Sequence, residues 1–207
     1  VKDHYQVLSE AAQSVASYQL RTRASIVGNI CNASPAGDTI GACLLLDGEL
    51  TIHGEGGMRH EPLKGFFHGP GQTALQVGDI VTSIHFPIPP DGLRGKYIKL
   101  GRNRASDLAI VGVTAIGYPD KGSGSGYSMK LALASVAPVP LVVDRVEEIL
   151  RQNPVTEETL SEAAQAAMDT CTPIDDVRGS ARYRKYMVRN LSLRALSDVW
   201  EKIKPVD

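Results

Sequence analysis

The feature that most constrains this fold is a block of strand patterns followed by a block of helix patterns in the second half of the chain. Strand-like stretches cover residues 96–102, 110–118 and 127–135, and the last alternates apolar with polar side chains. Helix-like stripes then cover residues 143–150, 156–168 and 180–203. Strands in such a run pair antiparallel, and the helices after them need an apolar face to cover. The pattern therefore predicts an α+β fold, an antiparallel sheet with helices packed on one side.

The last two helical stripes also predict how each helix starts and faces. Thr156 is a predicted N-cap, because Glu157 and Glu158 follow it in the first turn. In the last stripe the apolar spacing predicts that the buried side chains are Tyr183, Met187, Leu191, Leu196, Trp200 and Ile203. The many arginines and lysines between them are most simply a solvated face.

A proline-rich stretch separates this block from the first half. The strand predicted over residues 79–86 ends at Pro87, because proline cannot donate a hydrogen bond to a neighbouring strand. Residues 87–95 are stiff and polar and show no periodicity. We therefore predict two domains, 1–92 and 93–207.

The first half mixes helix and strand patterns. Residues 3–16 have apolar side chains at helical spacing, and residues 40–46 predict a short buried helix. Residues 49–54 predict a strand that returns over 58–60 after a glycine-rich turn. His53 and His60 lie on either side of that turn, but no further Cys, Asp or His cluster accompanies them, so we expect no metal site.

Between these elements, residues 24–38 form a stretch of short polar side chains and glycine that predicts a loop. Gly28 would let a ligand approach the main chain closely, and Asn29 and Ser34 favour turns. Asp38 stands where the next helix would start, so its carboxylate could cap that helix or accept from a ligand hydroxyl. Neither common phosphate-loop spacing is present, and spacing alone favours a polar loop that ends in a helix cap over a ligand site.

Arg21 and Arg23 immediately precede this loop. They could supply positive charge to a phosphate-bearing ligand, or they could simply be the solvated edge of a loop. The sequence leaves both readings open.

Composition excludes several classes of protein. A formal net charge of −1 gives no electrostatic reason to expect nucleic acid or an anionic membrane as a partner. Three scattered cysteines without a C-x-x-C pair argue against disulfides, zinc and iron–sulfur clusters on this chain. No apolar run approaches the roughly 20 residues of a membrane span. We therefore expect a reducing, cytoplasmic location.

Two ordered signatures resemble the FAD subunits or domains of the molybdenum-hydroxylase family, the relatives of xanthine dehydrogenase and aerobic carbon monoxide dehydrogenase. Ser25-x-x-Gly28-Asn29, Asn32-Ala33-Ser34-Pro35 and Asp38 resemble the second FAD-contacting segment, with Val27 where the usual form has glycine. Tyr97-Ile-Lys99, with Asp107 eight residues after the lysine, resembles the signature that opens the C-terminal domain.

The resemblance implies a set of FAD-binding residues and their roles. Tyr97 would lie by the isoalloxazine ring, and the ammonium of Lys99 would favour reduced, anionic flavin. Val81 would make a backbone contact on the adenine side. The implied FAD-binding residues are Ser25, Ile26, Val27, Gly28, Asn29, Ser34, Asp38, Val81, Tyr97, Lys99 and Asp107. Without the resemblance, Tyr97 and Lys99 would be ordinary sheet-surface residues, and Asp107 a turn residue.

The resemblance also implies a fold and a function. Residues 1–92 would be the second lobe of a two-lobed α/β FAD-binding domain (PCMH-type), and residues 93–207 the flavoprotein C-terminal domain. The chain would be a C-terminal fragment of an electron-transfer subunit, lacking the first FAD lobe, which a separate chain could carry. Electrons would pass from an iron–sulfur subunit, itself supplied by a molybdenum-binding large subunit with molybdopterin, through FAD to an acceptor such as NAD. No catalytic side chains are expected, because the sequence shows no Ser-His-Asp set and the flavin would carry the chemistry.

Two alternatives remain open at this point. One is a non-catalytic interaction module that kept the fold but lost tight FAD binding, which Val27 would favour. The other is a distant flavin enzyme that reduces a nucleotide sugar, which the absence of an evident proton donor makes less favourable.

Overall fold

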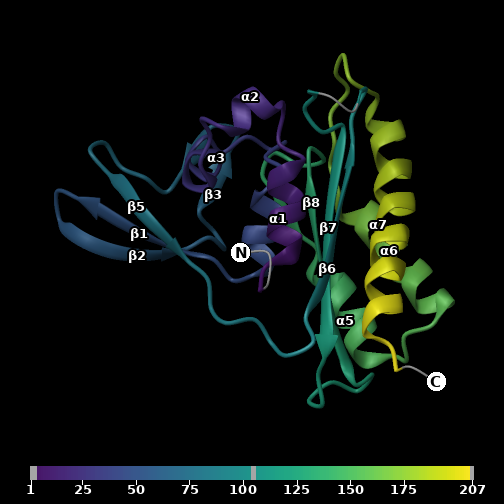
Figure 1. The fold of residues 1–207 in the computed structure, drawn as a ribbon. Coiled ribbons are helices and arrows are strands. Elements are labelled where there is room, and N and C mark those ends of the chain that lie inside the picture. The colour runs from purple at the N-terminus through teal and green to yellow at the C-terminus, as the bar shows by residue number, and fades with distance from the viewer. Residues whose placement is uncertain (1–3, 104–105, 206–207) are drawn as a thin grey trace.

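The computed structural model describes residues 4–103 and 106–205, and its centre is a four-stranded antiparallel sheet (Figure 1). In spatial order the strands are β6 (Arg94–Leu100), β7 (Val111–Pro119), β8 (Tyr127–Ala134) and β9 (Leu141–Val142). The first three occupy the stretches where the sequence predicts strands, whereas the short β9 was not predicted. Val113 opposite Leu133 and Ala115 opposite Leu131 define the register between β7 and β8.

One face of this sheet is covered by the three C-terminal helices (Figure 1). They are α5 (Asp144–Gln152), α6 (Glu157–Thr170) and α7 (Ala181–Ile203). Val113 and Ala115 of β7 are fully buried beneath them, together with Leu131 of β8 and Leu196 of α7. The side chains of a strand alternate between its two faces, so every second residue of β7 enters this core. The predicted α+β class, with C-terminal helices on one side of an antiparallel sheet, is confirmed.

The opposite face is covered by two helices of the first half, α1 (Gln6–Gln13) and α4 (Ile40–Leu45). Ile116 of β7 and Ala132 of β8 are buried in this second core. Gly41 lets α4 come close to the sheet, because a Cβ at this position would lie 2.7 Å from Oγ1 of Thr114. The sheet is thus the middle of three layers, and the residues before and after the predicted boundary at residue 92 share a buried interface.

A second, three-stranded sheet projects from the body of the molecule (Figure 1). Its order is β2 (Gly57–Pro62), β1 (Glu49–Gly54) and β5 (Ile80–His85), all antiparallel. Leu50 and Ile52 of β1 are fully buried and join the core of the first half. A small hairpin of β3 (Phe67–Gly69) and β4 (Gln72–Thr73) lies between β2 and β5 in the chain.

Two short helices that the sequence does not predict precede α4. They are α2 (Tyr18–Arg21) and α3 (Ile26–Cys31), and each begins after a serine. Ser17 Oγ accepts from the backbone N–H of Leu20 at 3.4 Å, and Ser25 Oγ accepts from that of Gly28 at 2.9 Å. The loop predicted over 24–38 is therefore wrong for residues 26–31, because a serine N-cap supplies the acceptor that a first helical turn needs.

The stripe predicted for α7 is confirmed in part. Leu196 and Ile203 are buried, and Met187, Leu191 and Trp200 are partly buried against the same core. The fully or nearly fully buried residues of α7 are Arg184, Val188, Ser192, Ala195, Leu196, Val199 and Ile203. Tyr183 is 43% exposed, and Arg184 is 1% exposed rather than part of a solvated face. None of the described helices combines the length and the apolar character needed to cross a membrane.

Candidate functional site

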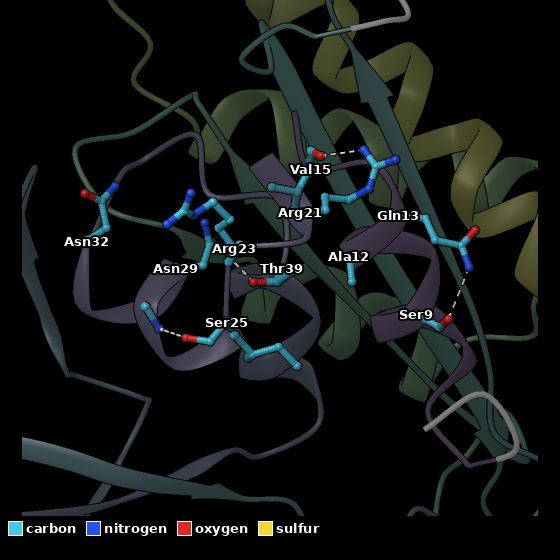
Figure 2. Close-up of a pocket in the computed structure, with 13 residues that line it drawn as sticks. Ser9, Ala12, Gln13, Val15, Arg21, Arg23, Ser25, Asn29, Asn32 and Thr39 are labelled. Carbon is cyan, nitrogen blue, oxygen red and sulfur yellow. Dashed lines mark hydrogen bonds between the residues drawn. The ribbon is translucent and has the colours of Figure 1, made fainter. Parts of the chain in front are cut away.

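A cavity of about 610 Å³ lies between α1 and α3, and we call it the α1–α3 cavity (Figure 2). The polar face of α1 contributes Ser9 and Gln13, and the start of α3 contributes Ser25, Gly28 and Asn29. Its full lining is Ser9, Ala12, Gln13, Val15, Arg21, Arg23, Ala24, Ser25, Ile26, Gly28, Asn29, Asn32 and Thr39. The predicted ligand segment thus forms one wall of a real cavity.

Two side-chain hydrogen bonds fix the geometry of that wall. Ser25 caps α3 through the N–H of Gly28, and a Cβ at residue 28 would lie 3.1 Å from Ser25 Oγ. The hydroxyl of Thr39 donates to Oδ1 of Asn29 at 2.7 Å. The bond uses the oxygen of the Asn29 amide, and its nitrogen makes no hydrogen bond with any described residue.

Two further cavities adjoin the first. The Asp38 cavity, about 330 Å³, is lined by Asp38, Ser34 and Asp107 among others. The Lys99 cavity, about 560 Å³, is lined by Lys99, Arg102 and Asp107 among others. The end of α1 and the residues after it separate the three cavities, because each of three residues there lines two of them. Val15 lines the α1–α3 and Asp38 cavities. Ala16 lines the Asp38 and Lys99 cavities, and Gln13 lines the α1–α3 and Lys99 cavities.

A buried cluster joins the two predicted signatures behind these cavities. The hydroxyl of Tyr97 donates to Oδ1 of Asp38 at 2.5 Å, and the ammonium of Lys99 donates to Oδ2 at 2.9 Å. Lys99 also donates to the backbone carbonyl of Ser14 at 2.9 Å. Tyr97 and Lys99 can both reach Asp38 because they share a face of β6, as their spacing predicts.

Asp38 therefore does not cap the helix that follows it. The N-cap of α4 is Thr39, which makes no side-chain cap bond, and the Asp38 side chain is only 6% exposed. Burial raises the pKa of Asp38, although the bonds from Lys99 and Tyr97 pull the pKa the other way. Burial and the neighbouring Asp38 charge raise the pKa of Tyr97 well above its ordinary value, so the phenol stays a hydrogen-bond donor.

Glu10 of α1 also binds strand β6, through its side-chain carboxylate. Glu10 accepts from the backbone N–H of Tyr97 at 2.9 Å and from the ammonium of Lys96 at 3.0 Å. The strand β6 is an edge of the sheet, so this N–H would otherwise have no partner within the sheet. The sequence analysis missed Glu10, and its only signal is a carboxylate on the polar face of the first helix.

Asp107 lies in the loop before β7, between the Asp38 and Lys99 cavities. Its carboxylate accepts from the backbone N–H of Arg102 at 2.7 Å and from Arg102 Nε at 3.2 Å. These bonds to Arg102 lower the pKa of Asp107. Asp107 is thus a turn residue, as expected without the family resemblance, and it also lines two of the cavities.

The structure brings most, but not all, of the predicted site residues to these cavities. Those that line at least one of the three are Ser25, Ile26, Gly28, Asn29, Ser34, Asp38, Lys99 and Asp107. Tyr97 lies behind the wall, 6% exposed, with its hydroxyl on Asp38. Val27 and Val81 line none of the three, and Val81 lies in the projecting sheet opposite Ile52.

The arrangement is suited to an elongated ligand with an anionic part. The α1–α3 cavity has arginines and amide side chains in its lining, whereas the two adjoining cavities carry carboxylates paired with cations. Among the described residues, no group of three His, Cys, Asp or Glu side chains is placed to hold a metal ion.

Comparison with known families assigns both halves of the chain. Residues 1–89 match the FAD binding domain in molybdopterin dehydrogenase, and residues 96–199 match the CO dehydrogenase flavoprotein C-terminal domain.

Individual relatives and solved structures agree with these matches. The chain is 29% identical over 196 residues to the putative xanthine dehydrogenase FAD-binding subunit XdhB of Escherichia coli K12, covering 94% of this chain and 66% of that protein. It is 31% identical over 197 residues to the carbon monoxide dehydrogenase medium chain of Hydrogenophaga pseudoflava, covering 95% and 67%. A structure of carbon monoxide dehydrogenase from the latter organism, lacking the Mo-pyranopterin moiety, superposes with a TM-score of 0.92 at 30% identity, covering 99% and 70%. The chain thus spans about two thirds of the length of these relatives.

Proposed function

Because the chain belongs to the family of FAD-binding medium subunits of xanthine and carbon monoxide dehydrogenases, we propose that it holds FAD along its three adjoining cavities and passes electrons within a larger complex. One observation carries this proposal. Asp38 of the first signature lies 2.9 Å from Lys99 of the second and also accepts from Tyr97. Two sequence signatures from opposite sides of the predicted boundary therefore meet at one place.

The residues present fit the cofactor. A volume of about 610 Å³ lies within the roughly 300–1,000 Å³ range of ligand pockets, and two further cavities extend it. In this proposal Ser25, Gly28 and Asn29 hold the phosphate-bearing part, and Asp38, Lys99 and Asp107 border the remainder. Bound FAD supplies the redox chemistry, while this chain binds, orients and shields it.

The role proposed for Lys99 changes once its partner is known. Its ammonium does not face the cofactor as an isolated charge, because the Asp38 carboxylate lies beside it. The pair has little net charge, so the positive potential that Lys99 alone would provide depends on the protonation of Asp38. Lys99 and Asp38 therefore act on the flavin as one unit.

For the complete assembly we propose the electron path that the family resemblance implies. Electrons pass from iron–sulfur clusters on a partner chain, supplied by a molybdenum-binding large subunit, through FAD to an acceptor such as NAD. Names of relatives support the multi-subunit arrangement, since one is a medium chain and another an FAD-binding subunit. A separate chain that carries the first FAD lobe stays a prediction, which co-purification followed by mass spectrometry checks.

The experiment for the proposed function is the visible absorption spectrum of the purified complex, followed by titration of FAD into the purified chain. We expect flavin bands in the complex and saturable quenching of FAD fluorescence by the chain. An assembly without flavin bands would refute the proposal. The alternative of a module that lost tight FAD binding rests on Val27, whose side chain does not line the α1–α3 cavity and so does not block it.

A further inference from the structure

We propose that Arg23 binds the diphosphate of the cofactor and makes the α1–α3 cavity an anion subsite, whereas Arg21 only stabilises the local fold. The inference rests on the proposed function and deepens it by naming the cation and the part of the ligand it recognises. Both arginines precede α3 and line the same cavity, so the sequence cannot separate their roles.

The two guanidinium groups differ in what they already contact. Nη1 of Arg21 donates to the backbone carbonyl of Val15 at 2.8 Å and to that of Ala16 at 3.0 Å. These carbonyls belong to the turn that follows α1, so Arg21, at the end of α2, holds that turn in place. The side chain of Arg23 makes no hydrogen bond or ion pair with any residue that the structure describes, so its donors remain available.

The surroundings leave the charge of Arg23 without compensation. No Asp or Glu is among the residues that line the α1–α3 cavity. Asp38 lines the neighbouring cavity and is already paired with Lys99 at 2.9 Å. A cavity that contains two guanidinium groups and no carboxylate in its lining favours an anionic ligand over a neutral or cationic one.

Neutral donors beside Arg23 complete the subsite. In Figure 2 the Arg23 side chain extends along the cavity towards Asn29 and Asn32. The oxygen of the Asn29 amide accepts from Thr39, and its nitrogen makes no hydrogen bond with any described residue, so this nitrogen can donate to a ligand. A planar guanidinium that binds two oxygens at once, flanked by amide N–H groups, matches the oxygens of a diphosphate.

The test compares three variants of the purified protein with wild type. Arg23→Gln removes the charge, Arg23→Lys keeps it without the planar fork, and Arg189→Gln removes an exposed charge on the far helix α7. We expect Arg23→Gln to raise the Kd for FAD roughly tenfold or more, Arg23→Lys to raise it less, and Arg189→Gln to leave it unchanged. The affinity for riboflavin, which has no phosphate, should be the same in all four proteins. Arg23→Gln should also flatten the dependence of FAD affinity on salt.

Thermal unfolding separates this role from a structural one. Arg21→Gln should lower the melting temperature, because two carbonyls lose their donor, whereas Arg23→Gln should leave the melting temperature near that of wild type. Equal FAD affinity in wild type and Arg23→Gln would overturn the inference and leave the proposed function standing. An equal loss of riboflavin and FAD affinity would also overturn it, since the diphosphate would then not be what Arg23 recognises.

A measurement without flavin distinguishes failure of the anion subsite from failure of the proposed function. Inorganic pyrophosphate should shift the amide NMR signals of Ser25, Gly28 and Asn29 in the wild-type protein, and Arg23→Gln should abolish the saturation of those shifts. Pyrophosphate binding without FAD binding would count against the proposed function alone. No pyrophosphate effect on these signals would count against the anion subsite.

Discussion

The ammonium of Lys99 lies 2.9 Å from the carboxylate of Asp38, although 61 positions separate the two residues in the chain. The contact joins the strand β6 to the segment just before α4, and both side chains are largely buried, 15% and 6% exposed. Breaking such a pair by removing one charge leaves the other without compensation in a poorly solvated place.

We therefore expect Asp38→Asn to destabilise the protein by about 3 kcal/mol. The amide would keep a single oxygen as acceptor, where the carboxylate accepts from both Tyr97 and Lys99. Urea denaturation at neutral pH measures the change, with Glu148→Gln as the control, because Glu148 pairs with Arg145 in an exposed position and its loss should cost less than about 0.5 kcal/mol. Equal free energies of unfolding for the two variants would show that the buried Asp38–Lys99 pair stabilises the protein no more than the exposed pair does.

A second prediction concerns the buried arginine of α7. Arg184 donates to the carbonyls of Ile110 at 3.0 Å and Ser135 at 2.8 Å, and to Asp176 at 2.6 Å. Arg184→Met should destabilise the protein by about 3 kcal/mol or more, because the carbonyls of Ile110 and Ser135 lose this donor and Asp176 keeps only Arg178 as a partner. Arg189→Met, an exposed change on the same helix, should stay within about 0.5 kcal/mol of wild type in the same urea titration.

A third prediction tests the close packing of α4 on the sheet. Gly41→Ala should destabilise the protein by about 1 kcal/mol or more, since the new methyl group meets Oγ1 of Thr114 at 2.7 Å and outweighs the gain in helix propensity. The loss should be smaller when Thr114 is first changed to alanine, and a double-mutant cycle of unfolding free energies measures this. Strict additivity would mean that the contact with Thr114 is not the cause.

A fourth prediction is a pH dependence in the projecting sheet. Arg59 donates to both oxygens of Asp79, at 3.0 and 2.6 Å, and this pairing, helped by the N–H of Gln76, lowers the pKa of Asp79 to about 2 from 3.8. A carboxylate with a lowered pKa in the folded state contributes stability that is present above pH 3.8 and is lost as the pH falls towards 2. The stability difference between wild type and Asp79→Asn should therefore shrink over that window. A constant difference across it would contradict the pairing.

Local patterns in the sequence predict most of the elements. Strands β6, β7 and β8 and helices α5, α6 and α7 lie where periodicity places them, and Thr156 caps α6 as expected, accepting from Thr159 N–H at 3.3 Å. Such features are local, since they depend on residues a few positions apart. The helix α3 was missed because its short polar residues suit a turn as well as a capped helical turn.

The burial of Tyr183 and the solvent exposure of Arg184 were predicted wrongly for a related reason. Hydrophobicity ranks Tyr183 above Arg184, yet Arg184 is the buried one, because the carbonyls of Ile110 and Ser135 supply the acceptors that make its burial possible. Those acceptors come from loops elsewhere in the chain, so no pattern within α7 predicts them.

The sequence by itself determined the class of fold and the family signatures around Ser25 to Asp38 and Tyr97 to Asp107, because these depend on residue types at fixed spacing. Only the tertiary structure decided that Asp38 pairs with Lys99 rather than capping α4. It also decided that Arg21 donates to the turn after α1, while the Arg23 side chain makes no hydrogen bond with any described residue. The reason is physical: spacing says which side chains share a face, but the partner of a buried or cavity-lining charge depends on which distant segment packs against it.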